Sequence, residues 1–250
     1  DPSDDEALRR RKVSANRILG LLKAALNHAF AEEKVASDAA WRRVKPFKSV
    51  NKSRASYLSF AECKRLINSA EPEFRLLVRG ALESGARYGH LTTLRVKDFN
   101  PDAGTLHVRP TARHGKQGEG YHIILSRDGR AFFEGITAGR ARVAYIFTHT
   151  TQNGVREWRK SEQQLPMRAA CKRAKIDPPV GFHQLRHTWA SHAVMAGMPL
   201  PVVARNLGHV DTRMVERHYG HLAPSYSADA VREHAPRFKV DEPNNVRAVR

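Results

Sequence analysis

Residues 181–222 read GFHQLRHTWASHAVMAGMPLPVVARNLGHVDTRMVERHYGHL, and this stretch decides how the chain is interpreted. It brings His183, Arg186, His187, His209 and Tyr219 into one short C-terminal region. Positions three apart lie on the same side of a helix, so the Arg186 guanidinium and the His183 imidazole point toward one volume. An arginine donates two parallel hydrogen bonds to a phosphate, and a histidine donates or shuttles a proton. With one tyrosine hydroxyl added, the set suits binding a phosphodiester and attacking it.

HQLRH has two other possible interpretations. Histidines four residues apart also occur in the HExxH motif of zinc metalloproteases, but here the second position is Gln184, whose amide cannot act as a general base. A single histidine is most often a polar residue on the surface of an amphipathic helix. The pairing with Arg186, and the further cations Arg87 in SGARYGHLTTL and Lys116 in RHGKQGEGYHIIL, favour a phosphate site over both.

Composition points to the same kind of ligand. The 250 residues carry 43 Lys plus Arg against 25 Asp plus Glu, a net charge of +18, and the pI is about 10.5. Such a surface favours a polyanion, because neutralising phosphates releases their counterions. The mean hydropathy of −0.55 and the absence of a long apolar run predict a globular protein with no membrane partner. Cys63 and Cys171 are too few for a disulfide framework, so we expect a reducing cytosol.

The periodicity predicts a mainly helical chain in two parts. Apolar residues recur with helical period from 14 to 34, and a short helix follows near 38–44, so residues 1–45 read as the end of a helical domain whose earlier part is missing. Residues 46–56 have the composition of a basic linker, and residues 239–250 that of a disordered tail. Between them we expect one domain with a β-hairpin formed by 105–109 and 121–125, a further short strand at 144–148, and a capping box that begins at Ser59. The predicted helices are 59–69, 73–84, 88–95, 128–137, 157–174, 183–196, 200–207 and 211–220.

Three segments, in this order, resemble the tyrosine recombinase (phage integrase) family. SGARYGHLTTLRVKDF (84–99) is similar to its first box, with a Gly-x-Arg at a helix start. FHQLRHTWASHAVMAG (182–197) is similar to its His-x-x-Arg helix, and NLGHVDTRMVERHYGHL (206–222) to its Leu-Gly-His turn and tyrosine. Lys116, seven residues before Ile123, matches the family's hairpin lysine. The resemblance covers about residues 57–238 and, less closely, 14–44.

The resemblance implies a fold and an organisation. The fold is α+β and mainly α-helical, a tyrosine-recombinase catalytic domain with a small β-sheet or hairpin at 57–238. Residues 1–45 would be the C-terminal part of the family's helical core-binding (SAM-like) domain, joined to the catalytic domain by the linker at 46–56.

The resemblance also implies a nucleophile and a pair of arginines that bind the phosphate. Tyr219 would attack the scissile phosphate and leave a 3′-phosphotyrosyl link, which conserves the bond energy. Arg87 and Arg186 would hold the non-bridging oxygens and stabilise the pentacoordinate transition state.

Further residues would move protons. Lys116 would protonate the leaving 5′ oxygen, His183 would assist proton transfer to or from Tyr219, and His209 would donate to the phosphate. His187, beside Arg186, would orient the box. The site lacks carboxylates, and its cationic and imidazole groups would repel a divalent ion, so we expect no metal and no cofactor.

Two departures from the family pattern stand out. His90 occupies the position three residues after Arg87 where the family usually has Glu or Asp. Ten positions separate His209 from Tyr219, where nine is commoner, and of the neighbours His218 and Tyr219 only the tyrosine offers the required oxygen.

The implied function is site-specific DNA recombination. The protein would act on double-stranded DNA as a homotetramer that holds two duplexes, together with DNA-bending accessory proteins. It would be located in the bacterial cytosol or nucleoid. A C-terminal segment at 226–235 would dock either in trans on a neighbour or in cis. Two alternatives stay open at this point: a type IB topoisomerase-like enzyme, and a DNA-binding module on the same fold without chemistry.

Overall fold

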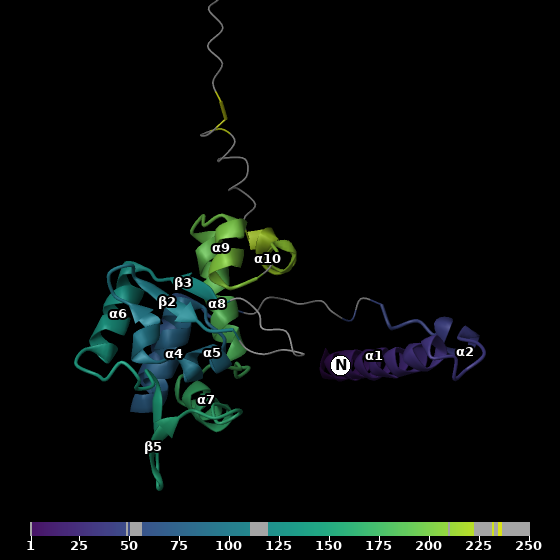
Figure 1. Ribbon diagram of the computed structural model, residues 1–250, viewed down its shortest axis with the longest axis horizontal. Helices are drawn as coiled ribbons and strands as arrows, with labels where there is room; N and C mark the ends of the chain where they lie inside the picture. The colour runs from purple at the N-terminus through teal and green to yellow at the C-terminus, as the bar shows by residue number, and fades with distance from the viewer. Residues whose placement is uncertain are drawn as a thin grey trace, which may run out of the picture. The chain divides into compact units, whose positions relative to one another are not determined.

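The computed structural model of the protein describes residues 2–48, 50, 57–110, 120–209, 211–222, 232 and 235–236 (Figure 1). The chain divides into two compact units, Asp1–Arg54 and Ala55–Arg250. Helices make up most of both units, and the second also carries two small antiparallel sheets, which confirms the predicted α+β, mainly helical class. The predicted tail at 239–250, and most of the predicted linker at 46–56, lie outside the described residues.

The first unit is built on one long helix, α1 (Pro2–Ala31), followed by the short α2 (Ala39–Arg42). α1 contains most of the segment predicted as a helix but begins at Pro2, where a proline and a run of acidic residues favour a helix N-terminus. The Asn16 side chain exchanges two hydrogen bonds with the backbone of Phe47, at 2.8 and 2.9 Å, and so ties the chain after α2 to α1. Ile18 and Leu21 on α1 each remain 66% exposed, so the predicted apolar stripe faces outward among the described residues of this unit.

The second unit begins with three helices, α3 (Phe60–Ser69), α4 (Pro72–Ser84) and α5 (Tyr88–Thr93). The predicted capping box is confirmed: the Ser59 hydroxyl accepts from the Glu62 amide at 3.3 Å, and the Glu62 carboxylate accepts from the Ser59 amide at 2.8 Å. α4 is the central helix, packed against α3, α5, α6 and α8.

The predicted hairpin is confirmed as the core of a three-stranded sheet. β2 (Thr105–Val108) pairs antiparallel with β3 (Tyr121–Ile124), with Leu106 opposite Ile123, and both of these side chains are buried. A two-residue strand, β1 (Phe99–Asn100), adds to the other edge of β2 after the 3₁₀ turn η1 (Val96–Asp98) and was not predicted. Of the strand expected at 144–148, Tyr145 forms a bridge with Arg95 and Thr148 begins β4.

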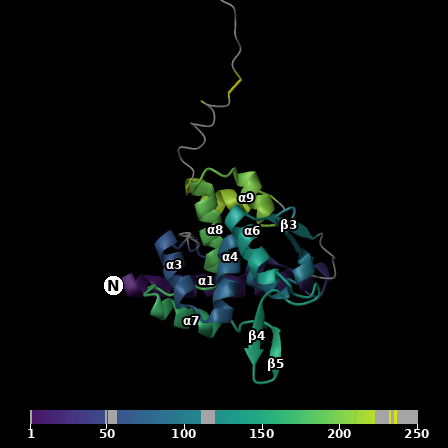
Figure 2. The same cartoon turned by 90° about the vertical axis from the view of Figure 1, so that its left-hand side faces the viewer.

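A second hairpin, which was not predicted, ends at Glu157, where a helix was predicted to begin. β4 (Thr148–Thr151) and β5 (Gly154–Glu157) project away from the helices (Figure 2), and the helix predicted at 157–174 is shorter, α7 (Gln164–Arg173). Two contacts favour the hairpin: the Trp158 indole stacks on His149 at 4.1 Å, and Glu73 on α4 accepts from the Thr150 amide at 2.9 Å. A helix from residue 157 would lose the extended backbone that these contacts require.

The remaining helices are α6 (Arg127–Thr137), α8 (His183–Met195), α9 (Leu200–Asn206) and α10 (Arg213–Tyr219), followed by the 3₁₀ turn η2 (Gly220–Leu222). α8 links two buried clusters. Its first half packs on α4 in the main core, and its second half packs with α9 and α10 around Val203 and Val215. The site residues of α8 therefore lie where the two cores meet.

The part of the chain that the structure describes contains no helix that is both long and apolar enough to cross a bilayer.

Candidate active site

Arg87 stands at the start of α5, directly after the turn that ends α4. Gly85 makes that turn with a φ of 65°, and a Cβ on it would come within 2.9 Å of both Trp189 and Leu207. A glycine is needed here, because other residues rarely adopt this conformation and no space remains for a side chain. The close approach brings the end of α4, and with it Arg87, against α8 and the end of α9.

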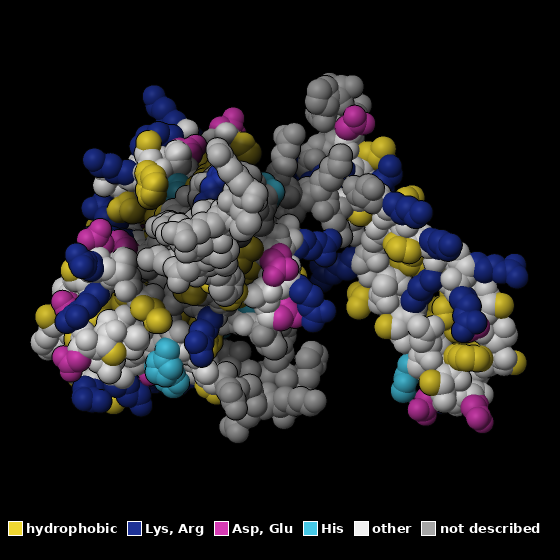
Figure 3. Space-filling model, turned by 90° about the horizontal axis from the view of Figure 1, so that it is seen from above, with side chains coloured by type: hydrophobic (Ala, Val, Ile, Leu, Met, Phe, Trp, Pro, Cys, Tyr) yellow, Lys and Arg dark blue, Asp and Glu magenta, His cyan; other side chains and the backbone are white. Residues whose placement is uncertain are grey.

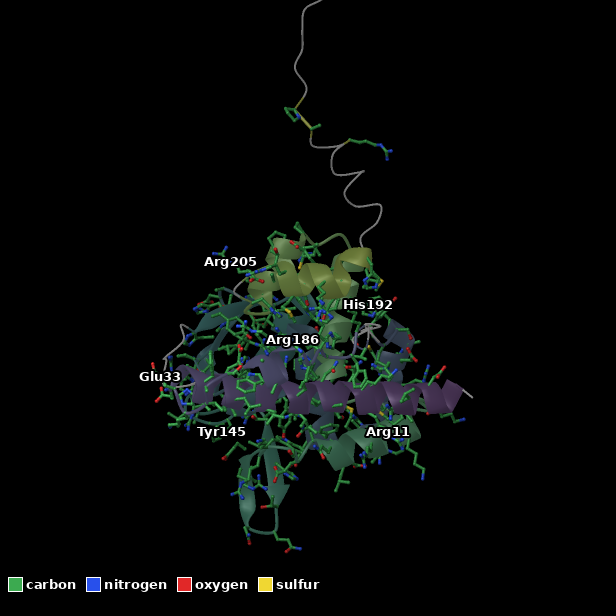
Figure 4. All side chains as sticks on the ribbon, turned by 90° about the vertical axis from the view of Figure 1, so that its right-hand side faces the viewer. Arg11, Glu33, Tyr145, Arg186, His192 and Arg205 are labelled. Atoms are coloured by element: carbon green, nitrogen blue, oxygen red, sulfur yellow. The ribbon has the colours of Figure 1, made fainter. Side chains whose placement is uncertain are left out.

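Arg186 lies in the first turn of α8 and is buried, with 3% of its surface exposed. Its Nη1 donates to the Gly85 carbonyl at 3.0 Å, and its Nη2 donates to the Leu207 carbonyl at 2.7 Å. Figure 4 shows this side chain in the interior, beneath α9 and α10. Three segments that are distant in sequence thus converge on one guanidinium.

The two arginines bring two positive charges close enough to affect each other. Burial lowers the pKa of Arg186 to about 10, and the charge of Arg87 acts in the same direction, so Arg186 stays a cation at neutral pH. A buried cation beside a second cation is unfavourable unless an anion compensates. A phosphate bound between Arg87 and Arg186 would remove that repulsion.

His209 extends this cluster from the Leu-Gly-His turn after α9. Its Nε2 lies 2.9 Å from Nη2 of Arg186. Because arginine can only donate, Nε2 accepts and the ring carries its proton on Nδ1. Burial, together with the charges of Arg186 and Arg87, lowers the pKa of His209 to about 4 and keeps the ring neutral. The Nδ1–H group is the donor that His209 can offer to a phosphate.

Tyr219 is the last residue of α10, and its ring belongs to the second core, with 4% of the residue exposed. Its hydroxyl lies 2.5 Å from Nδ1 of His187. Burial raises the pKa of Tyr219 to about 12. His183 lies one turn before His187 on α8, exposed at the helix start, with the two rings 4.9 Å apart and edge-on. The partner of the hydroxyl is therefore His187, whereas the sequence predicted His183 for that role.

His90 occupies the position where the family usually has Glu or Asp, and it pairs with a tyrosine. Its Nδ1 lies 3.1 Å from the hydroxyl of Tyr121 on β3. Burial lowers the pKa of His90 to about 4, with Arg87 and Arg186 adding to the effect, so the ring is neutral. Burial is also the main influence on the pKa of Arg186, and Tyr121 opposes it by hydrogen bonding and charge. The pair His90–Tyr121 thus occupies the side of the arginine cluster where a Glu or Asp was expected.

Five of the six predicted site residues belong to this region: Arg87, His183, Arg186, His209 and Tyr219. Lys116, the sixth, lies in residues 111–119, outside the described residues. Sequence reasoning missed Tyr121, for which no motif existed, and gave His187 only an orienting role. The spacing of four between His183 and His187 was the available signal, since it puts both rings on one helix face.

Charge over the rest of the protein fits an anionic ligand. Lys and Arg side chains are spread widely over the face seen in Figure 3, with fewer acidic ones between them. Among the described residues, no three His, Cys, Asp or Glu side chains are grouped so as to hold a metal ion.

The sequence model of the phage integrase family matches residues 56–225. This match spans more than half of the 250-residue chain. The chain belongs to the phage integrase family.

Two phage integrases are among the relatives of this chain. The chain is 27% identical over 232 residues to the integrase of Salmonella phage P22, a match that covers 90% of this chain and 58% of the relative. It is 27% identical over 230 residues to the integrase of Haemophilus phage HP1 (strain HP1c1), covering 89% and 60%. The chain therefore spans less than two thirds of the length of these relatives.

Solved structures of the phage integrase family share the fold. The XerA recombinase gives a TM-score of 0.55 at 20% identity, covering 92% of this chain and 94% of that one. The catalytic domain of bacteriophage HP1 integrase gives 0.53 at 26% identity, covering 72% and 95%. The Tn1549 transposon integrase, solved with circular intermediate DNA, gives 0.68 at 15% identity, covering 92% and 84%. The predicted tyrosine recombinase fold is confirmed.

Proposed function

We propose that this chain cuts and rejoins DNA at specific sites through a covalent 3′-phosphotyrosyl intermediate, as the catalytic part of a site-specific recombinase. The observation that carries this proposal is the cluster around Arg186. A buried guanidinium lies within the field of Arg87 and hydrogen-bonds to His209, and Tyr219 presents a hydroxyl from the adjoining helix α10. This combination offers an anion clamp and a nucleophile in one place.

Double-stranded DNA is the proposed substrate. The net charge of +18 supports it, and the Tn1549 transposon integrase that shares this fold was solved with DNA. The first unit would act as the end of a core-binding domain and the second as the catalytic domain. We place the activity in the bacterial cytosol or nucleoid, where that substrate is found.

Five of the six predicted site residues have a proposed role in holding the phosphate or in breaking the strand. Arg87 and Arg186 hold the non-bridging oxygens, and Nδ1–H of His209 donates to the same phosphate. Tyr219 attacks phosphorus, and Lys116 protonates the 5′ oxygen that leaves. The cations take the place that a metal ion has in other phosphoryl-transfer sites, so no cofactor is required.

The test is a covalent trap. The protein is incubated with a library of randomised duplexes that each carry a nick, so that a cleaved end is lost and the adduct accumulates. Adducts that survive denaturation are recovered and sequenced, and the selected site is resynthesised as a suicide substrate. We expect an adduct with the wild type and none with Tyr219→Phe. Tyr145→Phe is the matched control, because it removes a tyrosine hydroxyl outside the cluster, one that accepts from Arg95, and keeps the ring that stacks on Arg95.

Each alternative function predicts a different result. A DNA-binding module without chemistry would retain DNA yet give no adduct with the wild type. A type IB topoisomerase-like enzyme would give an adduct on a single duplex and relax supercoils, but would not exchange strands between two selected sites. Strand-exchange products from two duplexes would support recombination.

Recombination on two duplexes requires four protomers, and we propose a homotetramer, assisted by DNA-bending proteins.

A groove of about 1180 Å³ lies between α3, α8, α9 and β3, and its walls include Phe60, Trp189 and Met198. Its apolar lining supports a role in receiving the C-terminal segment at 226–235, from a neighbour or from the same chain. Deletion of the residues after Pro224 should leave DNA binding intact and abolish synapsis if the segment docks in trans. Retained synapsis would favour docking in cis.

A further inference from the structure

The hydroxyl of Tyr219 is held by one histidine. Its oxygen lies 2.5 Å from Nδ1 of His187, a contact that joins α10 to α8. Within the described residues, the His183 ring meets the His187 ring edge-on rather than the Tyr219 hydroxyl. His187 thus lies between the exposed His183 and the buried tyrosine.

The protonation states fix the direction of this hydrogen bond. Four groups face His187: His183 and Arg186 from α8, and His218 and Tyr219 from α10. Burial lowers the pKa of His187 to about 4, and the charges of His183, His218 and Arg186 act in the same direction. Burial raises the pKa of Tyr219 to about 12. The phenol therefore keeps its proton and donates it, and Nδ1 of a neutral His187 accepts.

We propose that His187, rather than His183, is the proton acceptor for Tyr219 in strand cleavage; this rests on the function proposed above. The phenolic proton passes to Nδ1 of His187 while the Tyr219 oxygen forms a bond to phosphorus. The bond from phosphorus to the 5′ oxygen breaks, and that oxygen leaves with the electron pair and takes a proton from a separate donor. In the rejoining step the imidazolium of His187 returns its proton to the departing Tyr219 oxygen.

The environment explains why transfer waits for DNA. In the DNA-free protein the proton stays on Tyr219, because the hydroxyl is a weak acid and His187 a weak base in this setting. Bonding of the oxygen to phosphorus makes its proton strongly acidic, and an adjacent phosphate anion favours a cationic imidazole. Proton transfer is then concerted with attack. His183, exposed at the start of α8, is left free to contact the phosphate.

The test compares His187→Asn and His187→Ala on the suicide substrate selected by the wild type. Asparagine places an amide oxygen near the position of Nδ1, so it keeps an acceptor for the hydroxyl but cannot take the proton. We expect His187→Asn to lower the single-turnover rate of adduct formation by about 100-fold or more, in line with the usual contribution of general base catalysis. His187→Ala should be slow as well, and added imidazole should restore its rate in proportion to the neutral form as pH rises.

A second substrate separates the two proton transfers. Replacing the bridging 5′ oxygen with sulfur gives a thiolate that leaves without a proton, so defects in the leaving-group acid disappear. The loss in His187→Asn should persist on this substrate, because the Tyr219 proton still has to be removed. Recovery to the wild-type rate would assign His187 to the leaving-group side and overturn the proposal.

Further outcomes are decisive. A wild-type rate and pH profile for His187→Asn would mean that His187 only orients the hydroxyl, and this result would also overturn the proposal. His149→Asn, on β4, is the matched control and should cleave at the wild-type rate. Melting temperature and DNA affinity report folding of each variant, and if His187→Asn is unfolded, imidazole rescue of His187→Ala decides alone. Absence of adduct with the wild type itself would instead reject the proposed function.

Discussion

The ring of Tyr121 lies against Gly208 so closely that a Cβ on Gly208 would be 2.5 Å from Tyr121 Cζ. Gly208 also has a φ of 66°, which only glycine adopts readily. The glycine of the Leu-Gly-His turn therefore serves packing against β3 as well as chain reversal. Through this contact, the strand that carries Tyr121 supports the turn that carries His209.

We expect Gly208→Ala to destabilise the protein by at least about 2 kcal/mol, the sum of a left-handed alanine and overpacking against the ring. Urea unfolding of the purified variant measures this. Gly135→Ala is the matched control: Gly135 lies exposed within α6, and a methyl group added there would meet no neighbouring atom within 4 Å, so the change should be neutral or stabilising by about 0.5–1 kcal/mol. Equal stability of the two variants would contradict the packing argument.

Arg186→Lys should abolish most of the cleavage activity. The guanidinium fork reaches the carbonyls of Gly85 and Leu207 at once, and a single ammonium cannot do so while also facing a phosphate. We expect a loss of about 100-fold or more in single-turnover adduct formation, the usual effect of removing a transition-state donor. Arg130→Lys, on the exposed side of α6 beside Glu134, should leave the rate unchanged. Full activity of Arg186→Lys would show that charge alone is sufficient.

His90→Glu should raise stability at neutral pH. A carboxylate at this position can still bond to the Tyr121 hydroxyl, and its charge would offset the repulsion between Arg87 and Arg186. We expect a gain of roughly 1 kcal/mol in unfolding free energy, with cleavage retained. Thermal melting checks the first expectation and the covalent trap the second. A lower melting temperature would mean that the neutral His90–Tyr121 pair is the better fit.

Stability should fall as the solution is acidified. The pKa values of His90, His187 and His209 are lowered from 6.5 to about 4 in the folded protein, chiefly by burial. Between pH 6.5 and about pH 4 these histidines bind protons in the unfolded chain but not in the folded protein. The stability that depends on these histidines is thus complete above about pH 6.5 and is lost progressively as pH falls toward 4. Urea unfolding between pH 7.5 and 4.5 tests this, and a flat profile would contradict it.

Chelators should not affect cleavage. The proposed transition-state charge is met by Arg87, Arg186 and His209, so excess EDTA is expected to leave the rate of adduct formation unchanged. The assay uses protein dialysed against EDTA and the selected suicide substrate, with added Mg²⁺ as the comparison. An EDTA-sensitive reaction that Mg²⁺ restores would reject this account of the site.

Local patterns predicted the fold well wherever local interactions decide it. The Ser59 capping box and the β2–β3 hairpin follow from neighbouring residues and match the structure. The β4–β5 hairpin was not predicted, because Glu73 on α4 and the stacking of Trp158 on His149 select it over a longer helix. The contact between Glu73 and Thr150 joins positions 77 residues apart, which no local window contains.

The residues of the candidate site also divide into those that local patterns and motifs predicted and those whose contacts depend on tertiary packing. Helical spacing was enough to place His183, Arg186 and His187 together, and the family motifs added Arg87, His209 and Tyr219. The hydrogen bond from Tyr219 to His187, and the meeting of Tyr121 with His90, depend on how α10 and β3 pack. The proton partner of the hydroxyl is therefore a tertiary property that a motif does not specify.

Arg186 binds the carbonyls of Gly85 and Leu207, which are separated by most of the second unit's chain length. A chain that has not been synthesised beyond residue 206 lacks the second of these acceptors. Such a chain cannot hold the guanidinium that the reaction requires. Under the proposed function, strand cleavage would therefore require that the segments carrying Gly85, Arg186 and Leu207 have all folded together.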